Sequence, residues 1–432
     1  MDRGANSHLR SAMTRKAFPP SDMKHVWILN HYAQEPGGAG GTRHFSLARH
    51  LPAHGWKATL IAASTDHSTG LQRLDAGEQK RLQHYDGVPF LWLRTRGYSG
   101  NGLDRVGNML DYTRAVLKRR NLSDLEAPDA IIGSSVHPLA AWAGRRLAKR
   151  HGVPFIFEVR DLWPQTLIDM GRISHGHPAA IGLRWLETSL YRDASRIIVL
   201  LPKANEYIEP LGVSPEKIIW IPNGVDLESF PVRPPMAPSS DRFTLMYFGA
   251  HGAANGLDNL LAAMQLVAQV PAGIRICLRL IGDGPLKPSL MAMASERGLT
   301  NVSFENPVPK SRIPDLAAQA DAFVFNLIDA PVFRYGISSN KLFDFLAAGR
   351  PVIFCCASSN NPVGEAGAGI TVPPEDPPAL AAAIVELASV PEAELIRMGQ
   401  AGRLYLDANH GMEKLAGRLA FALDASLGRP SR

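Results

Sequence analysis

Residues 25–63 read HVWILNHYAQEPGGAGGTRHFSLARHLPAHGWKATLIAA, and their pattern sets the architecture expected for the chain. An apolar run at His25–Asn30 predicts a buried strand, and Lys57–Ala63 predicts another. Between them, a glycine-rich loop at 35–41 leads into a helix that Thr42 can cap. A strand, a loop, a helix and a second strand in this order are typical of a parallel sheet with helices on both faces.

The same alternation continues outward from this unit. Strands are predicted at Ala130–Ser134, Pro154–Val159 and Arg196–Leu201, with helices between them. The region Leu71–Asn121 is less regular and yields one predicted helix, near Arg105–Arg120. A chain that repeats strand and helix in this way is expected to have the α/β fold class.

A proline-rich segment divides the chain. Phe230–Asp241 contains four prolines and two serines, which predicts a linker, and a second α/β series follows it. We therefore expect a disordered tail at 1–22, a Rossmann-like domain at 23–229, a second one at 242–410, and a C-terminal helix at 411–432 that packs back toward the first domain. Two doubly wound domains leave a cleft at the carboxyl ends of their strands, where such sheets bind ligands.

Composition is that of a globular protein. The 432 residues are 45% hydrophobic and 20% charged, and no apolar run reaches the ~18 to 20 residues of a transmembrane helix. The first 22 residues lack the apolar core of a secretory signal. Cys277, Cys355 and Cys356 lie in apolar runs and are expected to be reduced core residues. These features predict a soluble, cytoplasmic protein.

The net charge of +6 is concentrated in two clusters, Leu117–Arg120 and Arg145–Arg150. Either could contact an anionic substrate or an anionic membrane, which would make the protein peripheral on the inner face of the cytoplasmic membrane. Both also fit helix ends, where cations favour the negative end of the dipole, and this interpretation is favoured for each. Aromatic residues are not interleaved with the cations, so no nucleic-acid partner is expected.

The glycine-rich loop is a first candidate site. Backbone amides at Gly37–Gly41 can approach an anion, and the following helix adds positive charge at its N-terminus. The loop lacks the G-x-G-x-x-G pattern, and the next strand ends in Ala62, Ala63 and Ser64 without an acidic residue for a dinucleotide ribose. A nicotinamide-dependent dehydrogenase is therefore disfavoured, and a merely flexible loop stays open as the alternative.

The segment 335–352, YGISSNKLFDFLAAGRPV, is a second candidate. Ser338–Lys341 fall at the start of a predicted helix and offer hydroxyls, free amides and a cation to a diphosphate. Asp344 follows one turn later and could accept hydrogen bonds from a ribose diol. A capped surface helix with an Asp344–Lys341 pair explains the spacing equally well.

Residues at two strand ends are expected to face the cleft. His137 follows one of these strands, although a lone histidine is more often structural than functional. Asp161 follows another and could contact the acceptor, serve as a base, or pair with Arg160. Trp163 offers a flat face for a sugar ring or a lipid-linked acceptor, and a core position is equally plausible.

No metal site is expected. His175 and His177 are spaced like a ligand pair, but no third ligand lies at a supporting distance in sequence, so an ordinary loop is favoured. No Asp-x-Asp triplet occurs in the chain, which agrees with metal-free donor binding.

The segment 338–344 resembles the nucleotide-binding helix of the retaining glycosyltransferases of family 4, which have the GT-B fold. Three other segments agree in order and spacing: 247–258, Ile221–Asp226 with Phe230, and Leu280–Pro285. In the first half, Glu158–Pro164 is similar to a subgroup that builds bacterial surface polysaccharides, often with an amino-deoxy sugar. The resemblance covers 24–427.

The resemblance implies donor contacts and shows departures from the family pattern. Asp344 stands where a family glutamate binds the ribose and is one methylene shorter. The first glutamate of that pair is replaced by Gly336, so contacts to the donor sugar would come from Ser338 or Asn340.

The cations that clamp the diphosphate in the family are also missing. Ala250 and Asn255 stand where an arginine and a lysine are usual, so Lys341, Arg43 or Arg160 would have to supply the charge. The resemblance puts donor contacts at Gly40, Gly41, Arg43, Gly249, Asn255, Gly282, Ser338, Ser339, Asn340, Lys341 and Asp344. It puts catalysis at His137 and Asp161, and acceptor contacts at Arg160 and Trp163.

The implied activity is transfer, with retention, of a sugar from a UDP-type donor to a glycan or polyprenyl-linked acceptor in surface polysaccharide synthesis. It needs no cofactor and no metal, and domain closure about the linker would assemble the site. Two alternatives stay open. A nucleotide-sugar epimerase or hydrolase would turn over the donor without an acceptor, and an inactive binding protein would bind it without turnover.

Overall fold

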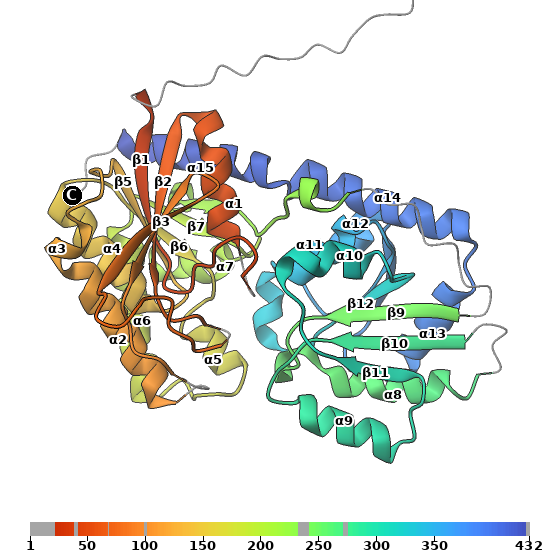
Figure 1. Ribbon diagram of the computed structural model, residues 1–432. Coiled ribbons are helices and arrows are strands. Elements are labelled where there is room, and N and C mark those ends of the chain that lie inside the picture. The colour runs from red at the N-terminus through yellow and green to blue at the C-terminus, as the bar shows by residue number, and fades with distance from the viewer. Residues whose placement is uncertain are drawn as a thin grey trace, which may run out of the picture.

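The computed structural model describes residues 22–38, 42–67, 69–98, 102–231, 242–270 and 275–428. The expected tail and most of the expected linker lie outside these ranges, as do Gly40 and Gly41. The described residues form two α/β domains, each built on one mainly parallel sheet (Figure 1). The predicted fold class is confirmed.

The first domain has a sheet of eight strands in the described residues, in the order β3-β4-β2-β1-β5-β6-β7-β8. The strands are β1 (Lys24–Leu29), β2 (Trp56–Ala63), β3 (Lys80–Tyr85), β4 (Val88–Leu93), β5 (Ala130–Ser134), β6 (Phe155–Val159), β7 (Arg196–Val199) and β8 (Ile218–Trp220). Neighbouring strands pair in parallel, except that β3 and β4 form an antiparallel hairpin at one edge. The central strands are apolar along their length because both faces are covered.

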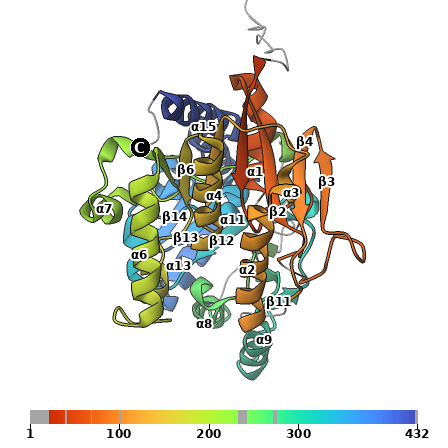
Figure 2. The same cartoon turned by 90° about the vertical axis from the view of Figure 1, so that its left-hand side faces the viewer.

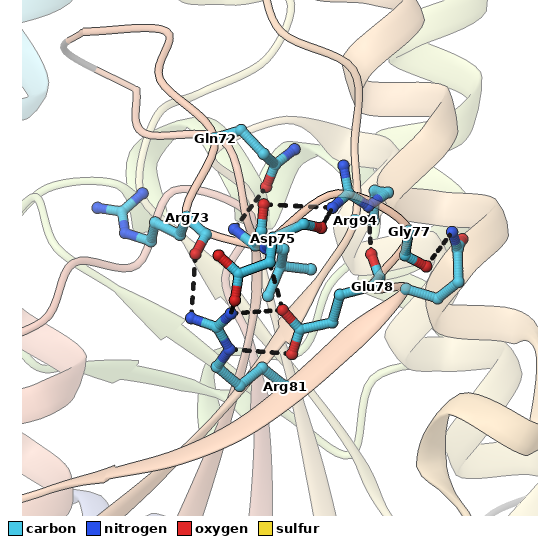
Figure 3. A network of polar contacts seen from close by, with 9 residues as sticks. Gln72, Arg73, Asp75, Gly77, Glu78, Arg81 and Arg94 are labelled. Carbon is cyan, nitrogen blue, oxygen red and sulfur yellow. Dashed lines mark hydrogen bonds and ion pairs between the residues drawn. The ribbon is translucent and has the colours of Figure 1, made fainter.

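The edge hairpin lies where the sequence predicted no strand. β3 is polar and largely exposed, so it lacks the apolar run of a buried strand. Polar contacts hold the turn before it (Figure 3): Arg81 donates to the carboxylates of Asp75 and Glu78, and Arg94 donates to the carbonyl of Leu74. These charge-assisted bonds fix a loop that contributes little to the apolar core.

Helices cover both faces of the first sheet. They are α1 (Arg43–His50), α2 (Leu103–Leu117), α3 (Arg119–Leu122), α4 (Pro138–His151), α5 (Gln165–Asp169), α6 (Pro178–Asp193) and α7 (Asn205–Ile208). Trp27 and Leu29 of β1 pack on the side of α2, α4 and α6, the three helices that face the viewer in Figure 2. Val26 and Ile28 point to the opposite side, as strand alternation requires.

The start of α1 differs from the expectation. The side chain of Thr42 makes no capping hydrogen bond, and only its carbonyl accepts the backbone N–H of Ser46. The helix is instead held by the burial of Phe45, Leu47 and Ala48 against the sheet. Tertiary packing, rather than a cap, therefore fixes this helix.

The second domain has a sheet of six parallel strands in the described residues, in the order β11-β10-β9-β12-β13-β14. The strands are β9 (Arg242–Phe248), β10 (Arg275–Ile281), β11 (Val302–Glu305), β12 (Ala322–Asn326), β13 (Val352–Cys355) and β14 (Gly369–Val372). The helices are α8 (Leu257–Val267), α9 (Lys287–Glu296), α10 (Ile313–Ala317), α11 (Asn340–Ala347), α12 (Pro362–Ala366), α13 (Pro377–Ala388), α14 (Glu392–Asn409) and α15 (Met412–Leu427). α8 and α13 pack on one face and α11 on the other.

Two features connect the domains. α15 returns to the first domain, where Leu415, Leu419 and Leu423 enter the core beside α1, and Lys24 pairs with Asp424 at 2.6 Å. Phe230, expected to open the linker, is 4% exposed and belongs to the core of the second domain, because its ring has apolar neighbours there. Among the described helices, none has the length and apolar character that crossing a bilayer requires.

Candidate functional site

A cavity of about 390 Å³ lies between the two domains, at the carboxyl ends of strands from both sheets. Arg160 and Asp161 line it from the first domain, directly after β6. Asn255 and the segment Gly336–Lys341 line it from the second domain. Residues that the sequence singled out in three separate segments therefore meet around one space.

The start of α11 faces this cavity. The apolar side of the helix is buried in the second domain through Leu342, Phe343, Phe345 and Leu346. Ser338, just before it, is held by the first domain: its Oγ accepts the backbone N–H of Asn223 at 2.8 Å, and its carbonyl accepts Asn223 Nδ2 at 2.6 Å. The first turn thus presents backbone amides to the cavity from a fixed position.

Lys341 is a partly buried cation in this wall. Its Nζ donates to the hydroxyl of Tyr247 at 3.1 Å and to Oδ1 of Asn255, and it lies 4.8 Å from the centre of the Tyr247 ring. Burial lowers the pKa of Lys341 to about 7. Among the described residues no carboxylate pairs with this ammonium, so its charge is left for a ligand.

One interpretation of the spacing paired Asp344 with Lys341, but the structure does not show this pair. The carboxylate of Asp344 binds the ammonium of Lys310, which sequence reasoning missed because no local pattern links the two positions. Burial raises the pKa of Asp344, and Lys310 opposes that shift. Asp344 lines a neighbouring cavity of about 340 Å³ together with Lys310 and Gly37, and Asn340 lines both cavities.

Arg43 is buried and is held by groups of the first domain. Its guanidinium donates to Glu158 Oε1 at 3.0 Å, to the carbonyl of Ile221 at 2.8 Å and to that of Pro222, and the residue is 2% exposed. Burial alone would raise the pKa of Glu158, but His44 and Arg43 hold it well below its usual range. Arg43 lines the neighbouring cavity of Asp344 but not the cavity of Lys341 and Arg160, and its charge is already paired with Glu158, which argues against the expected role as a diphosphate clamp.

His137 is also placed differently from the expectation. Its Nδ1 accepts the backbone N–H of Ala140 at the start of α4, and its Nε2 lies 2.5 Å from Nδ1 of His31. His31 in turn lies 2.6 Å from Oδ1 of Asn108. Burial lowers the pKa of His137 to about 3, with Arg105 adding to the effect, so the ring is neutral. Both ring nitrogens are occupied, and His137 does not reach the cavity.

The residues that follow β6 lie in different places: Arg160 and Asp161 line the cavity, and Trp163 does not. The guanidinium of Arg160 has no carboxylate partner among the described residues, and its backbone N–H is fixed by Ser135 Oγ at 3.0 Å. Asp161 is exposed toward the cavity, and desolvation by the surrounding walls raises its pKa while Arg160 opposes the shift. Trp163 is turned away, with its indole N–H donating to the carbonyl of Ser135 at 3.1 Å.

Three glycines of the site allow close backbone approach. A Cβ on Gly282 would lie 1.9 Å from the carbonyl oxygen of Gly249, so the ends of β9 and β10 can meet only without side chains. Gly336 has φ +103°, and a Cβ there would lie 2.5 Å from Cδ of Pro202 in the first domain. Gly336 stands where the resemblance implies a glutamate, and Pro202 of the first domain lies where the side chain of that glutamate would begin.

The histidine pair near α6 has a structural role. Nδ1 of His177 accepts the backbone N–H of Ala179 at 3.1 Å and so caps the helix. Within the described ranges, no three histidine, cysteine, aspartate or glutamate side chains gather as a metal site would require.

Comparison with known proteins identifies both domains. Residues 38–224 match the model of the glycosyl transferase 4-like domain, and residues 242–389 match that of the glycosyl transferases group 1. The chain is 27% identical over 279 residues to the "Probable glycosyltransferase WbjE" of Pseudomonas aeruginosa, which covers 61% of this chain and 68% of that protein.

Solved structures share the fold at low identity. Anabaena HepE, in complex with UDP and glucose, aligns with a TM-score of 0.63 at 15% identity and covers 93% of this chain and 99% of its own. WaaG, a glycosyltransferase involved in lipopolysaccharide biosynthesis, aligns with a TM-score of 0.62 at 15% identity and covers 92% and 98%. With a glycosyl transferase 4-like domain in its first half and a group 1 domain in its second, the chain is a glycosyltransferase of the GT-B type.

Proposed function

We propose that the protein transfers a sugar from a nucleoside diphosphate donor to a hydroxyl group of an acceptor, in the cavity between its domains. Lys341 carries this proposal: it is a desolvated cation without a carboxylate partner, beside a helix N-terminus and in the same cavity as Arg160. A bound anion stabilises cations in this state, and a diphosphate supplies negative charge in a compact group. The two glycosyl transferase domains make a sugar nucleotide the natural source of that diphosphate.

One donor molecule would span both cavities. Asn340 lines both, so a diphosphate beside Lys341 and Ser338 could continue to a ribose beside Asp344. HepE was solved with UDP and glucose, which supports a UDP-linked donor. The role of WaaG in lipopolysaccharide biosynthesis supports a surface polysaccharide pathway, with a glycan or polyprenyl-linked acceptor at the cytoplasmic side of the membrane.

The chemistry follows from the charges around the cavity. The bond between the anomeric carbon and the diphosphate oxygen breaks, and Lys341, Arg160 and the amides of α11 neutralise the departing charge. The acceptor oxygen attacks from the same face, which gives retention. Asp161 takes the acceptor proton, since its exposed carboxylate has a raised pKa and is therefore a stronger base than an ordinary aspartate. The products are the nucleoside diphosphate and the glycosylated acceptor.

The proposal is tested by Lys341→Met, which keeps the aliphatic stem and removes the charge. UDP affinity measured by calorimetry should fall by roughly tenfold to a hundredfold, the usual range for one charge-assisted contact. Lys414→Met, at an exposed lysine on α15, should bind UDP as the wild type does. Unchanged UDP affinity in Lys341→Met would overturn the site. Release of UDP from the donor at the same rate without any acceptor would favour a hydrolase instead, and conversion of the donor sugar to its epimer without net release of UDP would favour an epimerase.

A further inference from the structure

Large apolar side chains are exposed on one face of the first domain. Leu103, Val106 and Leu110 lie on one side of α2, with 89%, 49% and 37% of their surface exposed. Ile181 and Trp185 follow each other by one turn on α6, with 60% and 74% exposed. Their spacing places each set on a single helix face, and a large part of that face is exposed. Clusters of this kind mark a surface that is covered by something else.

Unpaired cations lie on the same layer of helices. The first three directly follow α2: Lys118 lies just after its end, and Arg119 and Arg120 begin α3. The second half of α4 carries the other three, Arg146, Lys149 and Arg150. Each of these six is exposed, and none pairs with a carboxylate among the described residues. The carboxylates nearby are already engaged, since Asp111 pairs with Arg96 and Asp193 with Arg145.

A groove lies among these cations, beside the C-terminal ends of α2 and α4. It has a volume of about 380 Å³ and is lined by Leu117, Trp142, Arg146, Lys149 and Arg150. The guanidinium of Arg146 lies 5.2 Å from the centre of the Trp142 ring, and Arg150 donates to the carbonyl of Leu117 at 3.0 Å. The groove therefore has cations at its rim and an apolar wall, a combination that suits a phosphate group attached to a hydrocarbon.

We propose that the outer face of α2, α3, α4 and α6 docks on an anionic phospholipid bilayer. Leu103, Val106, Ile181 and Trp185 enter the interfacial region, and the six unpaired cations contact lipid phosphates, with the groove holding one headgroup. The three long helices lie side by side on this face (Figure 2). We call this surface the docking face.

The combination of groups favours a bilayer over the other anionic partner, a nucleic acid. A phosphodiester backbone would use the cations but would leave Leu103, Ile181 and Trp185 in water. A bilayer uses both, because its interface offers anionic headgroups and an apolar layer directly below them.

The orientation of the docking face also suits the proposed function. Only this point, and not the docking face itself, rests on that function. In a parallel sheet the helices start at the edge where the strands end, so Leu103 and Ile181 lie toward the edge that carries the cavity. Docking through these residues brings the cavity close to the membrane surface, where a lipid-linked acceptor would be presented.

Flotation of the full chain with lipid vesicles tests the docking face. Vesicles of phosphatidylcholine with about a third phosphatidylglycerol should carry the protein at low salt, and vesicles of phosphatidylcholine alone should not. The triple variant Arg146→Gln, Lys149→Gln, Arg150→Gln should bind roughly a hundredfold more weakly, at roughly fivefold for each cation removed. Leu103→Ser with Trp185→Ser should weaken binding as well, and should do so at high salt too, where charges are screened.

A second triple variant controls for net charge. Arg275→Gln, Arg312→Gln and Lys414→Gln remove the same charge from exposed positions outside the docking face and should leave vesicle binding unchanged. UDP affinity is measured on the same proteins as an independent test of folding and of the donor site. If the wild type floats with the vesicles but does not bind UDP, the result counts against the proposed function alone. Equal weakening by the two triple variants, or wild-type binding by the Leu103/Trp185 variant, would overturn the docking face and favour non-specific charge or a nucleic acid.

Discussion

At the level of single residues, the site depends on how Lys341 is desolvated. Its ammonium has a tyrosine hydroxyl, an amide oxygen and two aromatic rings as neighbours, and no described carboxylate pairs with it. Burial therefore favours the neutral amine and lowers the pKa of Lys341 to about 7. About half of the unliganded molecules would carry the charge at neutral pH, and an anion would draw the other half into the charged form.

This gives donor binding a defined pH dependence. We expect the affinity for UDP-glucose, the ligand in another HepE structure, to be highest below pH 7 and to fall as the pH rises through that value. The ammonium is lost at higher pH, so binding there must take up a proton, by at most about one tenfold change per pH unit. Calorimetry in buffers of different ionisation enthalpy measures this uptake directly. Lys341→Arg stays charged and should show no proton uptake, and a matching slope in that variant would assign the effect to another group.

The sequence predicted the place of some residues of the site and not of others. Lys341 and Arg160 lie in the cavity, and their place follows from elements that the local pattern predicts, a helix start and a strand end. Arg43 and His137 occupy equivalent places in their own elements, yet both are buried by partners far along the chain, Glu158 and His31. Local spacing carries no information about such partners, so the two residues could not be separated from Lys341 and Arg160, which line the cavity.

At the level of elements, a buried network joins three parts of the first domain. Glu158 lies in β6, Arg43 begins α1, and Arg43 also donates to the carbonyl of Pro222, directly before Asn223, which holds Ser338. The position of α11 is therefore tied through Asn223 to the core of the other domain. Neither Arg43 nor Glu158 lines the cavity of Lys341, so the network acts on the wall of that cavity through the position of α11.

Breaking the network on one side should destabilise the first domain strongly. Arg43→Met or Glu158→Gln alone leaves a buried group without its partner and should cost roughly 3–5 kcal/mol in urea unfolding at pH 7. The double variant should cost clearly less than the sum, since neither group is then left unpaired. The pKa of Glu158 is lowered in the fold, so its contribution is complete above the unfolded value and is lost as the pH falls through the folded one. Additive costs at pH 7 would show that the two groups act independently.

The elements themselves were predicted where burial leaves a pattern. Apolar strands such as β1, β5 and β9 are covered on both faces and read as continuous apolar runs. The hairpin of β3 and β4 was missed because β3 lies at the sheet edge, where polar side chains such as Lys80 and Gln83 are tolerated. Its pairing is decided by β4, which is apolar, and by the polar turn around Asp75.

At the level of the whole molecule, the domains also meet beside the cavity. The backbone N–H of Lys203 in the first domain donates to the carbonyl of Tyr335 in the second at 3.0 Å. The ring of Tyr335 lies 5.8 Å from that of Tyr207 and is part of the core of the first domain. Gly336 packs against Pro202 at the same place. This small contact therefore helps to hold the two lobes together, alongside α15 and the Asn223–Ser338 bonds, and it lies beside one wall of the site.

A buried carboxylate beneath this contact should make it sensitive to pH. Glu187 is 2% exposed and accepts the hydroxyls of Tyr191 and Tyr207, each at 2.9 Å, and burial raises the pKa of Glu187 to about 7. An acid whose pKa is raised by folding is stabilised in its protonated form, so the stability that Glu187 contributes should be lost as the pH rises from about 4.5 through about 7, by up to roughly 3 kcal/mol in total for a shift of this size. Glu187→Gln keeps the shape and stays neutral, so its thermal midpoint should lose less over this range than that of the wild type. Glu365→Gln, at an exposed glutamate that also accepts a tyrosine hydroxyl, should behave as the wild type does. If the Glu187 and Glu365 variants follow the same pH profile, the carboxylate beneath Tyr207 does not control how firmly the two domains are held together.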